Sequence, residues 1–141
     1  MTGRTFVDSN ILIYAHDADA GSKQKRAAAR LTELWKSGTG LLSTQVLQEF
    51  YVNVTRKLKT PVASSTAREV VSTYGAWIRE PTTAKTVTRA IDIAGMAQIQ
   101  FWDALIVACA EDAQATQLYS EDLNSGQSIA GVKIVNPLVS T

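Results

Sequence analysis

Four acidic residues of this sequence could do chemistry together: Asp8, Glu49, Asp103 and Asp122. Each follows a short apolar, strand-like segment or lies in an early turn of a predicted helix. Carboxylates that converge repel one another and raise each other's pKa, and a divalent cation relieves that repulsion. Because oxygen would be the only ligand type, Mg²⁺ or Mn²⁺ is the favoured ion.

A cation held in this way would lower the pKa of a bound water and stabilise the charge of a phosphate during in-line displacement. This is the chemistry of a metal-dependent nuclease, and it needs no histidine. Asn10 and Ser43, which lie near Asp8 and Glu49 in the sequence, would orient the carboxylates or the water through hydrogen bonds.

Each acid also has a purely structural interpretation. Asp8 could cap the helix that follows it, a role worth ~1 kcal/mol, and Asp103 could complement a helix dipole. Asp122 could be an ordinary loop residue, as could its neighbour Glu121. Glu49 falls at the edge of the apolar stripe of its predicted helix. The nuclease interpretation therefore requires that the four acids converge in the fold.

The residue counts exclude several other kinds of site. One histidine, His16, and one cysteine, Cys109, are too few for a zinc site of Cys and His ligands. A Ser-His-Asp triad would need His16, which we expect near a helix end in a capping or surface role. Cys109 lies in the apolar stretch "DALIVACAE" and is expected in the core. No glycine-rich phosphate-binding loop of the P-loop or dinucleotide type occurs.

The composition is that of an ordinary globular domain. The 141 residues are 45% hydrophobic and 19% charged, which suffices for one core, so we expect a single domain over residues 1–141. A net charge of +1 gives no sign of a strongly basic nucleic-acid-binding surface. The start lacks the features of an export signal, no run of ~18 apolar residues predicts a membrane span, and the single cysteine fits a reducing compartment. We therefore expect a cytoplasmic protein without membrane contact.

Short apolar segments alternate with helical periodicity along the chain. Strand-like segments are predicted at residues 5–7, 41–43, 116–120 and 132–136. Helices are predicted at residues 11–15, 23–36, 44–57, 63–77, 87–97 and 101–115. The last helix is apolar on every side in its middle, which should therefore be buried all round. In the helix 87–97 we expect Val87, Ile91, Ile93 and Ala94 to face the core.

This alternation predicts an α/β fold, a three-layer α/β/α sandwich around a small central parallel sheet. In a parallel sheet, the loops that follow the strands share one edge, where ligands usually bind. Asp8 and Asp122 follow strands and should project to that edge. Glu49 and Asp103 lie in helices that can begin near it, so the fold class favours convergence of the four acids.

Five stretches, in order along nearly the whole chain, carry a family resemblance: "FVDSNILIYA", "LLSTQVLQEF", "FWDALIVACA", "LYSEDLNSG" and the closing strand "VKIVNP". Together they resemble the PIN-domain family, and within it the small VapC-type ribonuclease toxins of bacterial toxin–antitoxin systems. One such motif alone is weak. Four acid-bearing motifs in order, at the ends of the expected elements, are specific.

The resemblance implies a Mg²⁺- or Mn²⁺-dependent endoribonuclease. By matching position, the four acids would form its catalytic and metal-binding site, supported by Asn10, Ser43 and Ser120. The fourth acid is open between Asp122 and Glu121, because the family varies there. The resemblance also implies a homodimer, a VapB-like antitoxin that covers the site, and structured RNA substrates such as tRNA or rRNA.

Two other functions are compatible with parts of the sequence. A non-catalytic protein- or RNA-binding module of the same fold would use the acids only as caps and solvated residues. A phosphoacceptor domain with Asp8 as the acceptor is disfavoured, because Asn10 stands where dehalogenase-like enzymes have a second aspartate. A receiver-type phosphoacceptor domain also needs a lysine near the site late in the sequence. The only candidate is Lys133, which lies in the last predicted strand. The complete acidic set favours the nuclease, since a binding module would not require it.

Overall fold

Helices and strands alternate through the chain as expected. The computed structural model describes residues 3–139. Its strands are β1 (Thr5–Val7), β2 (Gly40–Leu41), β3 (Gln117–Tyr119), β4 (Ser128–Ile129) and β5 (Val132–Val135). Its helices are α1 (Ser9–Ala15), α2 (Ser22–Ser37), α3 (Thr44–Arg56), α4 (Ser64–Tyr74), α5 (Ala84–Ala97), α6 (Phe101–Asp112) and the 3₁₀ helix η1 (Gly75–Trp77). The ends of the predicted domain, residues 1–2 and 140–141, lie outside the described residues.

The sheet has five strands in the order β2-β1-β3-β5-β4. The first four are parallel, and in the centre Phe6 of β1 pairs with Leu41 of β2 and with Leu118 of β3. The carboxyl ends of β1, β2 and β3 therefore share one edge of the sheet, which confirms the predicted small parallel sheet.

The edge strand β4 departs from the prediction, which treated this segment as loop. It pairs antiparallel with β5. The two strands are joined by Ala130 and Gly131, whose φ angles are 51° and 79°, and two positive φ angles are what a tight hairpin turn requires. A strand of two residues is too short to show an alternating pattern, so no periodicity in the sequence predicts it.

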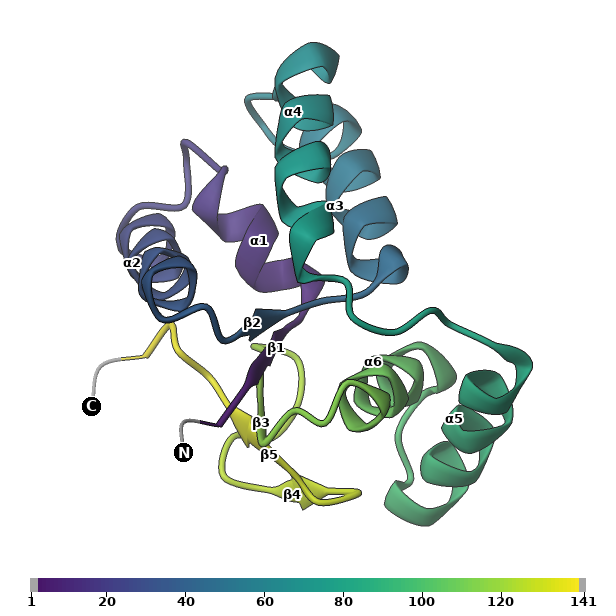
Figure 1. Ribbon diagram of the computed structural model, residues 1–141. Coiled ribbons are helices and arrows are strands. Elements are labelled where there is room, and N and C mark those ends of the chain that lie inside the picture. The colour runs from purple at the N-terminus through teal and green to yellow at the C-terminus, as the bar shows by residue number, and fades with distance from the viewer. Residues whose placement is uncertain (1–2, 140–141) are drawn as a thin grey trace.

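Helices cover both faces of the sheet, which confirms the three-layer arrangement. Figure 1 shows α1 and α2 on one side of the strands and α5 and α6 on the other, with α3 and α4 standing together beyond β2. The polypeptide crosses from one layer to the other through η1 and the loop that follows it. Segments far apart in sequence thus meet at the sheet.

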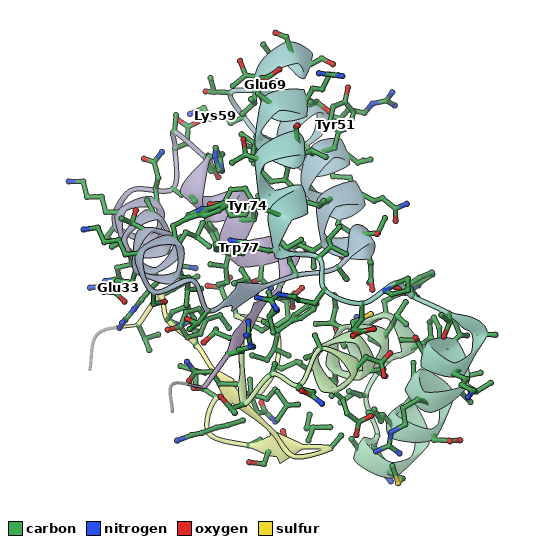
Figure 2. The ribbon with its side chains drawn as sticks, in the orientation of Figure 1. Glu33, Tyr51, Lys59, Glu69, Tyr74 and Trp77 are labelled. Atoms are coloured by element: carbon green, nitrogen blue, oxygen red, sulfur yellow. The ribbon has the colours of Figure 1, made fainter. Side chains whose placement is uncertain are left out.

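The β2 edge is held by an aromatic cluster of Trp35, Tyr74 and Trp77. Their ring centroids lie 4.7 to 5.3 Å apart, and Figure 2 shows Tyr74 and Trp77 side by side where α4 runs into η1. Gly40 packs directly under this cluster, because a Cβ atom there would lie 2.7 Å from the ring of Trp77. The absence of a side chain at Gly40 lets β2 approach closely, and β2 leads directly into Ser43 and α3.

Helix α6 is buried as predicted, with every residue from 104 to 110 in the core. No single helix within residues 3–139 is long and apolar enough to span a membrane. Helices α5 and α6 reach that length and composition only as a pair, across a bend of 117°.

The predicted inner face of α5 is partly wrong. Val87 and Ile91 are 36% and 57% exposed, whereas Ala90 and Ile93 are buried. Helix α5 packs against α6 through the small Ala90, and Thr86 donates a hydrogen bond from its hydroxyl to Asp112 of α6 at 2.8 Å. Thr86 and Ala90 are thus buried in place of the larger Val87 and Ile91, whereas Ile93 is buried as predicted.

Candidate active site

Asp8 follows β1 directly and lies at the carboxyl edge of the sheet. Its side chain is only 4% exposed. The Oδ1 atom accepts a hydrogen bond from the backbone N–H of Ser9 at 2.7 Å and so caps α1. The Oδ2 atom accepts from the hydroxyl of Ser120 at 2.8 Å and from the amide of Asn10 at 3.4 Å. The capping interpretation is therefore confirmed, yet the cap uses only one carboxylate oxygen.

The surroundings of Asp8 raise its pKa to about 7, chiefly because burial disfavours the charged carboxylate. Hydrogen bonds from Ser120 and from the backbone of Ser9 oppose this rise, and the negative charges of Asp122 and Glu49 add to it. A buried carboxyl that ionises near neutral pH, at the ligand-binding edge of a parallel sheet, is typical of a functional site.

Asn10 and Ser120 connect Asp8 to the loop that follows β3. The Asn10 amide donates to Asp122 Oδ2 at 3.0 Å, and its carbonyl oxygen accepts from the backbone N–H of Glu121 at 3.2 Å. The Ser120 hydroxyl oxygen accepts from the backbone N–H of Asp122 at 3.2 Å. Both residues thus contact Asp8 and the Asp122 segment at once, which is the geometry that an orienting role requires.

Glu121 is held by other partners. Its carboxylate accepts from the hydroxyl of Tyr14 at 2.5 Å and from the ammonium of Lys23 at 2.7 Å. Burial acts to raise its pKa, but the hydrogen bonds from Lys23 and Tyr14 outweigh burial and lower it. Asp122, rather than Glu121, is therefore the acid that is tied to Asp8.

Glu49 lies half-buried on α3. Its pKa is raised, chiefly by burial, with further contributions from the negative charges of Asp103 and Asp122. Interactions with the side chains of Ser9 and Gln45 oppose the rise. Glu49 therefore interacts electrostatically with acids from two other segments, the first turn of α6 and the loop after β3.

Asp103 occupies the first turn of α6, where its charge complements the helix dipole. Its Oδ2 atom accepts a hydrogen bond from the side-chain amide of Gln100 at 3.1 Å. The predicted structural role is thus compatible with the structure, and the interaction with Glu49 places the same carboxylate within electrostatic range of the other acids.

Ser43 begins α3, is 2% exposed, and makes no capping bond with its side chain. Its hydroxyl approaches the Cys109 thiol closely enough to lower the pKa of that thiol, which burial raises more strongly. No hydrogen bond of ordinary geometry satisfies the hydroxyl within the part of the chain that the structure describes. Within residues 3–139 the Ser43 hydroxyl therefore makes no hydrogen bond to any of the four acids, and its predicted orienting role stays a prediction.

The four carboxylates are not close enough together to bind one metal ion in this conformation. Across residues 3–139, no three Asp, Glu, His or Cys side chains are grouped so that they could hold a metal ion as they stand. Three of the four carboxylates accept hydrogen bonds from neutral side chains: Asp8 from Ser120, Asp122 from Asn10, and Asp103 from Gln100. The donor set itself, carboxylate oxygen without nitrogen or sulfur, fits Mg²⁺ or Mn²⁺.

Three residues that contact the acidic side chains of this region were not predicted as site residues. Tyr14 and Lys23 hold Glu121 across 107 and 98 residues of sequence, and no local pattern signals such a contact. Gln45 precedes Glu49 by one helical turn, and the i, i+4 spacing could have indicated that their side chains interact.

The family comparison agrees with the resemblance of the motifs. The sequence pattern of the PIN domain matches residues 5–126, which include the four acids. No curated protein sequence matches this chain.

Solved structures show the same fold at low sequence identity. A toxin–antitoxin complex from Klebsiella pneumoniae is 20% identical with a TM-score of 0.66, and the match covers 94% of this chain and 97% of that one. VapBC2 from Rickettsia felis, bound to a DNA fragment from its promoter, is 18% identical with a TM-score of 0.62, and the match covers 92% of this chain and 96% of that one. VapC20 from Mycobacterium tuberculosis, a toxin that cleaves the sarcin–ricin loop, is 18% identical with a TM-score of 0.59, and the match covers 82% of this chain and 88% of that one. The likeness covers most of each chain and shows the fold.

Proposed function

Because this chain belongs to the PIN-domain family, we propose that it is a metal-dependent endoribonuclease that hydrolyses phosphodiester bonds of RNA. The observation that carries the proposal is the buried carboxyl of Asp8, whose pKa of about 7 reflects burial and the charges of Asp122 and Glu49. Burying a carboxylate beside two other negative charges lowers the stability of the fold, and such an arrangement is typical of a functional site. A divalent cation would offset the repulsion among these groups.

The residues fit the ion by their chemistry. Asp8, Glu49 and Asp103 would hold Mg²⁺ or Mn²⁺, and Asp122 would help to hold a second ion or position water. When bound, such an ion supplies an activated water and stabilises negative charge on the phosphate.

The supporting side chains act on the carboxylates rather than on the substrate. The Asn10 amide, which donates to both Asp8 and Asp122, keeps the two carboxylates in a fixed relation. The Ser120 hydroxyl donates to Asp8 and partly offsets the rise in pKa that burial causes. This hydrogen bond favours the ionised form that a metal needs.

The biological role that fits best is that of a VapC-type toxin. The similar structures include toxin–antitoxin complexes and an RNA-cleaving toxin. By analogy, we propose a VapB-like antitoxin that covers the acidic site, a homodimer, a structured RNA such as tRNA or rRNA as the substrate, and action in the cytoplasm.

The test compares wild-type protein with Asp8→Asn and with Asp92→Asn, an exposed aspartate on α5 that serves as the matched control. Purified protein freed of antitoxin is incubated with cellular RNA and Mn²⁺ or Mg²⁺. We expect wild type and Asp92→Asn to cleave, and Asp8→Asn to lose at least roughly a hundredfold in rate, since even outer partners of a metal site cost 10–100-fold.

Sequencing of RNA 5′ ends after induced expression would then locate the cleavage sites. New ends should appear with wild type and be absent with Asp8→Asn. If wild type leaves all RNA intact while a control nuclease works, or if Asp8→Asn remains equally toxic to cells, the chain is instead a non-catalytic binding module of the same fold.

A further inference from the structure

A cleft lies beside the candidate active site, between the first turns of α3 and α6. Its volume is about 380 Å³, within the range of small-ligand pockets. Gln45 and Gln48 of α3 form one wall, and Trp102 of α6 lies on the other. The lining residue Gln45 interacts with Glu49, and Trp102 directly precedes Asp103 in the first turn of α6, so the cleft adjoins the acids.

Trp102 is unusually open to solvent for a residue of its size. Its side chain is 60% exposed, whereas Trp35 is 39% and Trp77 only 5% exposed. The ring of Phe101 meets it edge-to-face at a centroid distance of 5.1 Å. An exposed indole that a neighbouring ring supports, next to a candidate nuclease site, offers a flat face for stacking.

The opposite wall offers hydrogen-bonding groups. The Gln45 amide donates a long hydrogen bond, 3.4 Å, to the backbone carbonyl of Trp102, and its side chain also interacts with Glu49. Its Oε1 atom is buried and has no hydrogen-bond partner among the described residues. Gln48 is exposed and lines the same cleft. A weakly tethered amide with an unsatisfied acceptor can turn towards a ligand that offers a donor.

We propose that this cleft binds an unpaired nucleobase of the RNA substrate next to the cleaved phosphodiester. Trp102 stacks on the base, and the amides of Gln45 and Gln48 bond to its edge. Proteins recognise single-stranded RNA by this combination of aromatic stacking and hydrogen bonds to exposed base edges. The proposal rests on the proposed function and deepens it, because it assigns an RNA-recognition site and a specificity-determining residue.

The charge of the protein supports this occupant. With a net charge of +1, the chain as a whole lacks the large excess of positive charge from which many nucleic-acid-binding proteins gain affinity. Stacking supplies affinity without added charge. An aromatic face opposite two side-chain amides is the pair of features that a nucleobase uses, because it offers a flat ring and an edge of hydrogen-bond donors and acceptors.

The test measures binding without cleavage. Fluorescently labelled single-stranded RNA oligonucleotides are titrated with protein in EDTA, using wild type, Trp102→Ala, Trp102→Phe and Met96→Ala. Met96 is 67% exposed on α5 and does not line the cleft, so it controls for the loss of an exposed apolar side chain. We expect Kd to rise roughly tenfold for Trp102→Ala, to change much less for Trp102→Phe, and to stay the same for Met96→Ala.

A second measurement reports stacking directly. Oligonucleotides that carry 2-aminopurine should lose fluorescence on binding wild type and Trp102→Phe, and keep it with Trp102→Ala. The proposal is overturned if Trp102→Ala binds RNA as wild type does, if the probe is not quenched, or if the main effect of Trp102→Ala is a change of oligomeric state in size-exclusion chromatography. The last result would assign Trp102 to a protein interface.

Failure of the two proposals can be told apart. If no RNA is cleaved with metal but binding depends on Trp102, the nuclease assignment fails and the base-binding cleft stands. If wild type cleaves RNA and Trp102→Ala cleaves it at the same sites and rate, the cleft proposal fails and the nuclease assignment stands. If wild type binds no RNA at all, the cleft proposal is rejected.

Discussion

At the scale of single residues, Asp8 combines a structural and a chemical role through its two oxygens. One oxygen caps α1, and the other faces Ser120 and Asn10. Burial raises its pKa to about 7, whereas an unfolded chain would ionise it near its usual value of 3.8. The folded protein therefore binds this proton more tightly than the unfolded chain does.

This difference predicts how the stability of the metal-free protein depends on pH. Between roughly pH 4 and pH 7 the folded state holds one proton more at Asp8, so the free energy of unfolding should fall as pH rises through this window. The effect is on the order of a few kcal/mol. Asp8→Asn, which mimics the protonated side chain, should remove it. Urea unfolding in EDTA at about pH 5 and about pH 8 measures the difference.

We expect Asp8→Asn to be more stable than wild type at both pH values and by a larger margin at the higher one, because the unfolded chain already ionises Asp8 at about pH 5. Asp92→Asn is the control, and it should change stability by the same small amount at both pH values. A gain for Asp8→Asn that is equal at both pH values would contradict the assigned pKa, because a proton-linked effect must depend on pH.

At the scale of the elements, strand β2 determines where α3 and therefore Glu49 lie. Its position depends on Gly40, which fits beneath Trp77 only because it has no Cβ. Trp77 cannot easily move away, since it packs against Trp35 and Tyr74 at centroid distances of 4.7 and 4.8 Å. The aromatic cluster and the candidate active site are thus coupled through a strand of two residues.

Gly40→Ala should destabilise the protein by about 1–3 kcal/mol, the typical cost of overpacking a core. Gly95→Ala is the matched control, because a Cβ at Gly95 of α5 would meet no atom within 4 Å. It should be neutral or stabilise the helix by roughly 0.5–1 kcal/mol. Chemical denaturation of the two variants tests this, and equal stability of both would show that Trp77 shifts without cost.

At the scale of the whole molecule, the four acids come from the residue after β1, from α3, from α6 and from the loop after β3, and only the folded chain brings them within electrostatic range. A metal that binds the folded state and not the unfolded chain must stabilise the fold, by about 2.7 kcal/mol at a hundred times its Kd. Metal-linked stability is therefore a test of the site that does not depend on knowing the RNA.

We expect millimolar Mn²⁺ to raise the Tm of wild type by several degrees in a thermal unfolding assay at neutral pH. Glu49→Gln should reduce this rise strongly. Glu69→Gln, at an exposed position of α4 (Figure 2), should leave it unchanged, and a monovalent salt at equal ionic strength controls for screening. An equal rise in wild type and Glu49→Gln would exclude Glu49 as a ligand.

The sequence by itself determined the alternation of strands and helices, the parallel sheet, the buried helix α6 and the motifs of the family, because these follow from local periodicity and from residue types at element ends. It could not determine the edge strand β4 or the inner face of α5, where Val87 and Ile91 were wrongly expected. Those features depend on pairing and close packing between elements.

Only the tertiary structure decided which residues of the site hydrogen-bond to one another. The Asn10 amide donates to both Asp8 and Asp122, whereas the Glu121 carboxylate accepts from Lys23. It also gave Asp8 its raised pKa and left Trp102 exposed beside the acids. Burial, charge and hydrogen bonding depend on neighbours about a hundred residues away in sequence, so types and spacing can nominate the residues of a site, but only the folded chain determines their chemistry.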